Sequence, residues 1–375
     1  MARRDINKSK FDTTTSLKLD IFRGCFREWY PVFIHSRYIK KVYVFDLFAG
    51  SGCDSEGDEG SPLILLNEAK GESRQHCSTI IKNKTDVHFV YNELDKDKSK
   101  ELEVNLRNNL RLCNMECHLD YCPYKDSLSF HHEEFKTLIH NNEIQDILNN
   151  QKYAKFVLLD QYGFKEVDSE IFQLLINSPV ADIVFFIASS FVKRFSELPA
   201  VLNYFDTKKI KWNNDRPKEC HQIIKEYYAS LLPKDREYYL HAFTMKKGSN
   251  YYGLIFCTAH SLGMEKFIKV CWSEDAQAGE SNCNVGGFLA SGSLFKEYES
   301  KEVVVRKQLQ ELVLSGSITS NVDGLKQALK LGCRPKVFVE AIKELKDQGK
   351  IGIIGEFNRK ATGIHNIDEY KIVIL

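Results

Sequence analysis

Five apolar runs of strand length recur along the first three quarters of the chain and constrain its fold more than any other feature. Each run is rich in Val, Ile, Phe and Tyr, as buried strands are; they cover residues 40–48, 86–94, 155–163, 181–189 and 250–259. Helical patterns lie between them, for example in residues 61–71 and 96–112. Strands that alternate with helices predict an α/β domain with a mostly parallel sheet covered on both faces.

The pattern of elements divides the chain into three predicted parts. Residues 40–295 fit one α/β domain, and residues 1–39 should form a helical segment that packs on it. Near residue 300 the pattern changes to three amphipathic helices followed by two short apolar stretches, which predict a β-hairpin. Gly332 separates the second and third helices by a short turn, as in a helix-turn-helix. Residues 300–375 are therefore predicted to form a winged-helix domain.

Composition and length narrow the class of protein. A chain of 375 residues with 43% hydrophobic content can bury a sizeable core. No apolar stretch reaches the length of a membrane span, and the first twenty residues carry charges where a signal peptide needs its apolar centre. Eleven cysteines without a regular framework are typical of reduced thiols. We therefore expect a cytoplasmic protein that contacts no membrane.

The charge is distributed unevenly although its sum is only +1. Residues 1–41 carry ten Lys and Arg against four acidic residues, and residues 301–375 carry thirteen against nine. The centre of the chain is correspondingly acidic. Basic ends favour an anionic partner such as DNA or RNA, but an ordinary solvated surface would explain the same charges.

Basic residues of the predicted winged helix are candidates for contacts with nucleic acid. They lie on its third helix and between the two hairpin strands, and they are Lys336, Lys343, Lys346, Arg359 and Lys360. The third helix also carries Glu340 and Glu344. A winged helix that binds protein, with lysines that merely solvate it, is the alternative.

The first strand runs directly into Ala49-Gly50-Ser51-Gly52. Glycines at the end of a strand allow backbone N–H groups to approach a ligand that a side chain would exclude. The stretch lacks the lysine of a phosphate-binding P-loop, and Ser55 stands where a dinucleotide-binding fingerprint has its third glycine. The ligand is therefore expected to be nucleotide-like but neither a triphosphate nor a dinucleotide.

Residues 46–52 read D-x-F-A-G-x-G and resemble motif I of class I S-adenosylmethionine-dependent methyltransferases. S-adenosylmethionine is a sulfonium cation with an amino-acid tail, so an acidic residue at the strand end suits it. Glu93, at the end of the next strand, is placed to accept hydrogen bonds from ribose hydroxyls. The resemblance implies a cofactor site that contains Asp46, Phe48, Ala49, Gly50, Ser51, Gly52 and Glu93.

A third feature, Asp160-Gln161-Tyr162-Gly163, stands at the end of a later strand. Methyltransferases that act on base amines carry Asp or Asn, Pro and an aromatic residue at this place. There the carboxylate or amide accepts from the exocyclic amine while the ring stacks on the base. We expect Asp160 and Tyr162 to take these roles, and the predicted catalytic residues are Asp160, Gln161, Tyr162 and Gly163, with Gln161 in place of the usual Pro.

Taken together, these motifs resemble the three-Cys-motif partner proteins, a family named for genes beside a radical-SAM-like protein. The shared order runs from Thr14-Thr15 before Lys18, through residues 45–52, 60–63, 92–95 and 156–164, to the terminal winged helix. The resemblance implies a Rossmann-like class I methyltransferase core, a radical-SAM-like partner, and a mobile-element or phage-defence setting. It adds Lys18 and Ser61 as cofactor contacts, although Lys18 on a helix surface would need no role.

Metal sites are not expected. Taking Asp54 in the acidic loop as a first calcium ligand puts Glu59 where an EF-hand needs glycine, so the loop is a cover over the cofactor or simply solvated. The spacing of Cys113, Cys117 and Cys122 is not that of a zinc site.

Two functions from different classes remain open. The first is an enzyme that transfers a methyl group from S-adenosylmethionine to an exocyclic amine of DNA or RNA. The second is an inactive protein that binds nucleic acid or serves as a scaffold, which Gln161 favours. Asp46, Gly50 and Glu93 favour the enzyme, because a scaffold has no need of a ribose-binding acid.

Overall fold

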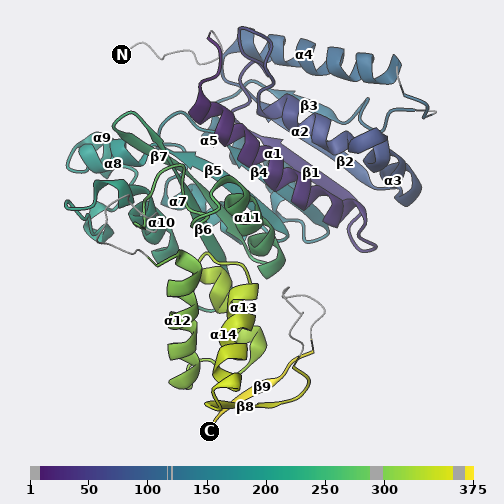
Figure 1. Ribbon diagram of the computed structural model, residues 1–375. Helices are drawn as coiled ribbons and strands as arrows, with labels where there is room; N and C mark the ends of the chain where they lie inside the picture. Colours follow the sequence, from purple (N-terminus) through teal and green to yellow (C-terminus); the bar gives the residue numbers. More distant parts are fainter. Residues whose placement is uncertain (1–8, 116, 120, 288–298, 358–367) are drawn as a thin grey trace.

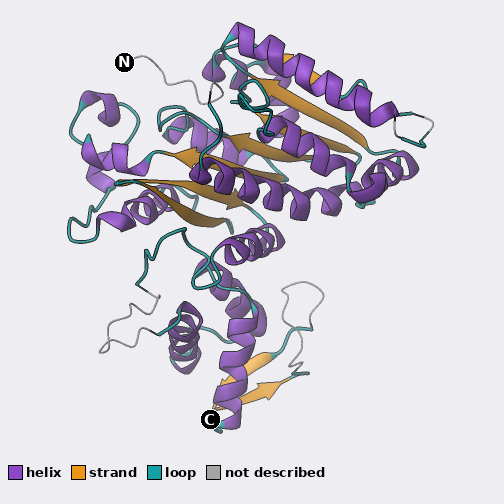
Figure 2. Ribbon diagram, turned by 45° about the horizontal axis from the view of Figure 1, so that its top comes forward, coloured by secondary structure: helices purple, strands orange, loops and turns teal. Residues whose placement is uncertain are grey.

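The computed structural model describes residues 9–115, 117–119, 121–287, 299–357 and 368–375. Its centre is a seven-stranded sheet in the order β3-β2-β1-β4-β5-β7-β6 (Figures 1 and 2). The strands are β1 (Lys41–Asp46), β2 (Asp86–Asn92), β3 (Leu128–His131), β4 (Tyr153–Leu159), β5 (Ala181–Ile187), β6 (Tyr239–Lys247) and β7 (Asn250–Thr258). Five of them occupy the five apolar runs, and the mostly parallel sheet is confirmed.

Strand directions place a reversal of the strand order beside β1. β1 pairs in parallel with β2 and β4, and among the seven described strands of this sheet only β7 runs antiparallel, to both β5 and β6. From β1 the chain moves outward to β2 and β3 and then returns to the other side of β1 to form β4. The order therefore reverses between β1 and β4, and at such a point α/β proteins bind ligands beyond the carboxyl ends of the strands.

Helices cover both faces of the sheet because strand residues alternate between two apolar cores. Val42 and Val44 of β1 belong to one core, and Tyr43 and Phe45 to the other. The first core is covered by α1 (Thr13–Ile34), α2 (Ser61–Lys70), α3 (Gln75–Asn83), α4 (Lys96–Met115) and α11 (Ser261–Glu274). The second is covered by α5 (Phe135–Ile139), α6 (Asn142–Asn149), α7 (Ser169–Asn177), α8 (Ser189–Arg194), α9 (Pro199–Leu202) and α10 (Cys220–Ser230).

Helix α1 begins at a clear capping signal and lies along the sheet (Figure 1). The carboxylate of Asp12 accepts hydrogen bonds from the backbone N–H groups of Thr14 and Thr15, both at 3.0 Å, as an N-cap residue should. Further along the helix, the rings of Phe26 and Trp29 pack on Phe156 of β4, with centroids 5.4 and 5.3 Å apart. This aromatic packing fixes the helix on the centre of the sheet.

The C-terminal region contains three helices and a two-stranded antiparallel hairpin. They are α12 (Lys301–Leu314), α13 (Asn321–Lys330), α14 (Lys336–Asp347), β8 (Ile351–Ile354) and β9 (Lys371–Ile374). Gly324 allows α13 to approach α14 closely, because a Cβ atom there would lie 2.0 Å from the Phe338 ring. The order of three helices and a hairpin is the one that the sequence predicted, and the hairpin stands apart from the large sheet (Figure 2).

Buried polar contacts join this region to the α/β part of the chain. The Nζ atom of Lys301 forms a 2.6 Å ion pair with Glu280 and donates to the carbonyl groups of Ala278 and Gly332. The indole nitrogen of Trp272, on α11, donates to the same Gly332 carbonyl at 3.1 Å. Lys301 therefore holds the start of α12 against two loops of the chain.

Removing the buried ammonium group of Lys301 should destabilise the protein. We expect Lys301→Met to lower the free energy of unfolding by about 3 kcal/mol, because Glu280 and two carbonyl groups lose their donor. Urea denaturation followed by circular dichroism measures the change. The control is Lys307→Met in the same helix, whose ion pair with Glu299 is exposed and should contribute less than about 1 kcal/mol. Equal losses in the two variants would contradict the assignment.

Candidate functional site

The predicted cofactor residues gather at the carboxyl end of β1, where the strand order reverses. Beyond Asp46 the backbone turns through Gly50 and Gly52, which have φ angles of +62° and +88°. Such angles favour glycine because a Cβ atom would crowd the following backbone. The acidic loop returns beside this turn, and the N–H group of Gly60 donates to the carbonyl of Gly52 at 2.8 Å. The glycine turn is therefore held in a defined shape.

Glu93 completes this turn from the neighbouring strand, as its position after β2 predicted. One carboxylate oxygen accepts from the N–H group of Gly50 and the other from the N–H group of Asp95, both at 2.9 Å. Each oxygen of an ionised carboxylate has two lone pairs, so both retain capacity for another donor. The structure thus brings Glu93 into contact with the glycine turn, although Glu93 and Gly50 are 43 residues apart in the sequence.

Asp46 is the least satisfied polar group of the site. It is completely buried, and no hydrogen bond of good geometry reaches its carboxyl oxygens among the described residues, although the Ser61 hydroxyl and the Phe48 N–H group lie close enough to lower its pKa. Burial is the main reason that the pKa of Asp46 is raised to about 7; Asp160 adds to the rise, whereas Ser61 and Lys18 oppose it. A buried polar group without a partner is costly. A ligand that brings a cation or a hydrogen-bond donor would offset this cost.

Lys18 reaches Asp160 from helix α1. Its ammonium group lies 2.5 Å from Oδ2 of Asp160, and both side chains are nearly buried. The same Nζ atom lies 5.2 Å from the centroid of the Phe186 ring, close enough for a cation–π contact. Because Lys18 and Asp160 also affect the pKa of Asp46, the three charged groups form one electrostatic unit at the carboxyl edge.

The three residues that follow Asp160 after β4 differ in their exposure to solvent. The Gln161 side chain is buried, where it donates to the Phe186 carbonyl and accepts from the Glu166 N–H group, both at 2.9 Å. Its amide thus holds the ends of β4 and β5 together. Tyr162 is 66% exposed, and Gly163 has a φ angle of +109° with open space around it. Asp160 therefore belongs to the electrostatic unit with Lys18, and Tyr162 is exposed to solvent.

The other predicted cofactor residues support the turn. Ala49 donates its N–H group to the carbonyl of Asn92, and the Ser51 hydroxyl donates to the carbonyl of Cys53. The Phe48 ring contacts Phe135, with centroids 5.0 Å apart. Ser61 begins α2 close enough to Asp46 to lower its pKa. These residues line or brace the same edge of the sheet.

Sequence reasoning missed two residues that shape this site. Asn105, on α4, donates from its side-chain amide to the carbonyl of Ser51 at 2.9 Å. Asp54 organises the acidic loop by accepting from the N–H groups of Phe11, Glu56 and Asp58 at 2.8–2.9 Å. The loop is thus folded around one of its own carboxylates and tied to the segment before α1. The bonds from Glu56 and Asp58 form a local turn that an Asp favours, but the contacts with Phe11 and Ser51 have no local sequence signal.

The predicted nucleic-acid contacts lie away from this edge, on α14. Lys336 pairs with Glu302 at 3.2 Å, Lys343 is exposed, and the Nζ atom of Lys346 lies 5.1 Å from the centroid of the Phe357 ring. Arg359 and Lys360 fall outside the described residues. The α14 lysines therefore offer some accessible positive charge, one of them already engaged by an acidic residue.

Cys113, Cys117 and Cys122 are free thiols, and within the described ranges no group of three or more His, Cys, Asp or Glu side chains could hold a metal ion. Burial raises the pKa of the Cys122 thiol, while that of the nearby Lys70 ammonium group is lowered, again by burial.

Comparisons with known proteins find similarity only among solved structures. No protein-family model and no curated protein matches the chain. Trm1 from Pyrococcus horikoshii, in complex with S-adenosyl-L-methionine, is 12% identical with a TM-score of 0.39, over 97% of this chain and 91% of that one. The O-methyltransferase TomG from Streptomyces achromogenes, in complex with SAM, is 11% identical with a TM-score of 0.32, over 67% and 92%. Likenesses this weak carry no conclusion about activity.

The buried Asp46 makes stability depend on pH. Its pKa is about 7 in the folded chain and about 4 in an unfolded one, so between these values the folded state keeps a proton that the unfolded state releases. The contribution of Asp46 to stability therefore falls as the pH rises from about 4 to about 7. We expect Asp46→Asn, which cannot ionise, to gain about 2 to 3 kcal/mol relative to the wild-type protein between pH 5 and pH 8.

Urea denaturation at the two pH values measures this gain. The matched control is Asp97→Asn, since the side chain of Asp97 is 96% exposed on α4. Its effect should stay within about 0.5 kcal/mol at both pH values. A gain for Asp46→Asn that is the same at pH 5 and pH 8 would contradict the burial of an ionisable group.

Proposed function

We propose that the chain is an S-adenosylmethionine-dependent methyltransferase that acts on an exocyclic amine of a nucleic-acid base. The observation that carries this proposal is the buried carboxyl group of Asp46, which receives no hydrogen bond of good geometry among the described residues. It lies at the reversal point of the sheet, beside a glycine turn that Glu93 braces. A cationic, nucleoside-containing ligand fits this combination of groups.

Each group of the site has a role toward the cofactor. When bound, S-adenosylmethionine supplies a methyl group carried on a sulfonium centre. The Asp46 carboxylate would accept from the ammonium group of the cofactor's amino-acid tail and so gain a well-aligned donor. Gly50 and Gly52 allow close approach of the backbone, and Glu93 accepts from ribose hydroxyls with its remaining lone pairs. Holding the cofactor in one orientation is most of what such a site must do.

The side chains after β4 suit a planar amine. Lys18 donates to Oδ2 of Asp160, which leaves Oδ1 to accept from an amine N–H group and to receive the proton that the amine loses. Tyr162 is exposed beside it, and Phe191, 44% exposed, stacks on the buried Phe164 with centroids 5.4 Å apart. Exposed aromatic rings near a carboxylate are suited to stacking on a base.

The lysines of the C-terminal region favour a polymeric, anionic substrate. We propose that its three helices and hairpin act as a winged helix, with Lys343 and Lys346 contacting phosphates.

The radical-SAM-like partner and the phage-defence setting that the family resemblance implies are part of the same proposal, as is a cytoplasmic location. Among the described helices, none combines the length and apolar character needed to cross a bilayer.

A scaffold without catalysis is the second candidate, and two contacts favour it. The Lys18 ammonium group already occupies one oxygen of Asp160, and the buried Gln161 amide fixes the following turn from inside. A site whose carboxylate is permanently engaged by Lys18 would bind a base less well. The two candidates differ in whether Asp160 can serve an incoming amine.

Cofactor binding should depend on Asp46 and Glu93. Isothermal titration with S-adenosylmethionine and S-adenosylhomocysteine should give binding to the wild-type protein that is at least tenfold weaker in Asp46→Asn and Glu93→Ala, since each variant loses a charge-assisted hydrogen bond. Affinity of the wild-type protein should rise from pH 5.5 to pH 7 as Asp46 ionises, and this rise should be absent in Asp46→Asn. Asp97→Ala on α4 is the control. Failure of both ligands to bind the wild-type protein would overturn the proposal.

Methyl transfer should depend on Asp160 without loss of the cofactor. We expect Asp160→Ala to bind S-adenosylhomocysteine within a few-fold of wild type but to lose at least 100-fold of methyl transfer, because a positioned base contributes about 10²–10⁴-fold. Transfer of radiolabelled methyl groups to single-stranded and double-stranded DNA and RNA measures this. Cofactor binding without transfer to any of these polymers would favour the scaffold.

A further inference from the structure

A surface with positive charge and exposed aromatic rings lies at the same edge of the sheet as Asp160. It is built from the turn after β4, from α8 after β5, and from the turn between β6 and β7 (Figure 1). The end of β6 belongs to this edge because β7 runs antiparallel to both β5 and β6. The residues of this α8 surface are Lys165, Phe191, Lys193, Arg194, Tyr204 and Lys246.

Contacts between side chains join these elements. The buried Phe164 ring lies beneath the surface, with its centroid 5.4 Å from that of Phe191 and 6.1 Å from that of Tyr204. Toward β7, the Arg194 guanidinium group donates to Oδ1 of Asn250 at 3.0 Å. Phe191 and Arg194 stand three residues apart in α8, so they project from the same side of the helix. Aromatic rings and positive groups are therefore neighbours on this surface.

Four cations of the α8 surface are held by neutral groups. Lys193 donates to a backbone carbonyl group at 3.0 Å, and Arg194 donates to a side-chain carbonyl group. The ammonium groups of Lys165 and Lys246 each lie 5.9 Å from the centroid of a tyrosine ring. None of these four partners is acidic, so the partners do not cancel the positive charges.

Acidic side chains near this surface are mostly engaged by other cations. Three of them form ion pairs of their own, namely Asp160 with Lys18, Asp168 with Lys136, and Asp12 with Lys247. Glu166 and Glu197 border the surface. The four cations therefore outnumber the acidic groups that they face, and the surface favours an anionic ligand.

Phe191 gives the α8 surface a flat apolar face as well. The residue is 44% exposed, although its ring packs on Phe164 and on Phe195, whose centroid is 4.5 Å away. An exposed ring that is held from below offers a planar partner a place to stack. Proteins that bind single-stranded nucleic acid combine such rings with positive groups that contact the backbone.

We propose that the α8 surface binds a single strand of nucleic acid. One base stacks on Phe191, and the neighbouring phosphate groups contact Arg194 and Lys165. Lys193 and Lys246 add positive charge along the path of the backbone. The inference rests on the proposed function in placing the target base at Asp160, whereas binding of the strand follows from the α8 surface itself.

Other anionic partners fit these observations less well. In a duplex the faces of the bases are covered by their neighbours and the exocyclic amines are paired, so neither Phe191 nor Asp160 would be used. A free nucleotide or phosphate would reach one or two of the cations, which belong to three separate segments of the sheet edge. A strand carries a phosphate at every nucleotide and can follow all of them.

Binding of labelled oligonucleotides to the full chain tests the proposal. Fluorescence anisotropy without cofactor should show that an unstructured single strand of about 12 nucleotides binds at least tenfold tighter than the duplex of the same sequence. The strand is tested as DNA and as RNA, which shows whether the sugar matters. Phe191→Ala should weaken the single-strand complex at least fivefold, because it removes the ring on which the base stacks.

The dependence on salt separates stacking from phosphate contacts. Arg194→Gln should weaken binding and lower the slope of log K against log salt concentration by about 0.7, as expected for the loss of one phosphate contact with a single strand. Phe191→Ala should keep the slope of the wild-type protein, because stacking on a neutral ring releases no counterion.

Matched controls lie at the opposite edge of the sheet. Tyr38→Ala removes a residue that is 91% exposed just before β1, and Lys82→Gln removes an exposed cation of α3. Neither should alter binding of the strand. S-adenosylhomocysteine should bind Phe191→Ala as it binds the wild-type protein, so a failure of the α8 surface is distinguished from a failure of the cofactor site.

Three results would overturn the proposal. The first is equal affinity of the wild-type protein for single strand and duplex, or binding to neither. The second is full affinity for the strand in Phe191→Ala. The third is loss of strand binding in Lys343→Gln on α14 but not in Arg194→Gln, which would assign the strand to the C-terminal region.

Discussion

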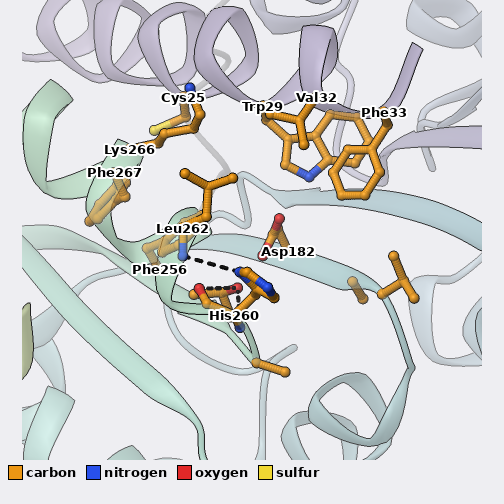
Figure 3. Close-up of a pocket in the computed structure, with 15 residues that line it drawn as sticks. Cys25, Trp29, Val32, Phe33, Asp182, Phe256, His260, Leu262, Lys266 and Phe267 are labelled. Carbon is orange, nitrogen blue, oxygen red and sulfur yellow. Dashed lines mark hydrogen bonds between the residues drawn. The ribbon is translucent and has the colours of Figure 1, made fainter. Parts of the chain in front are cut away.

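The packing of α1 across the sheet fixes the positions of side chains at both ends of the parallel strands. The helix is 22 residues long, or about 33 Å at 1.5 Å per residue. Near its start Lys18 pairs with Asp160 at the carboxyl edge, and near its end Trp29 lines a cavity of about 380 Å³ beside Asp182, at the start of β5 (Figure 3). Between these points Phe26 packs on Phe156 of β4. Because the helix is continuous, a shift of this aromatic contact would displace a charged group at one edge and a hydrogen-bond donor at the other.

Sequence patterns predicted the features that depend on local periodicity and on parallel topology. The five apolar runs became strands because strands buried on both faces need continuous apolar residues, and β1 and β2 begin and end within two residues of the expected positions. The parallel topology also predicted that Gly50, Glu93 and Asp160 lie near one another. Carboxyl ends of neighbouring parallel strands meet at one edge, so residues far apart in the chain could be placed together before any contact was known.

The rest depends on contacts between distant segments that leave no local pattern. β3 has four residues and only partial burial, too short for its alternation to stand out, and β6 follows a polar stretch. The role of Asp54 requires Phe11, 43 residues earlier, and the cavity requires Trp29 to meet Asp182. Gln161 is the clearest example of a residue whose contacts the sequence does not predict. Its place after a strand predicted a role in catalysis, which stays a prediction, while its amide bonds inward to Phe186 and Glu166.

Two buried carboxyl groups, one at each edge of the sheet, are hard to explain by stability alone. Asp46 and Asp182 both have a pKa raised mainly by burial, so each favours the proton-bound or ligand-bound state over the free carboxylate. Apolar residues of similar volume are often as stabilising as buried ionisable groups, or more so. Stability would therefore favour Leu or Asn at either position. Function explains the Asp46 carboxyl group better, because no hydrogen bond of good geometry reaches it among the described residues and a donor-bearing ligand can satisfy it, whereas Asp182 interacts with Thr258 and Trp29.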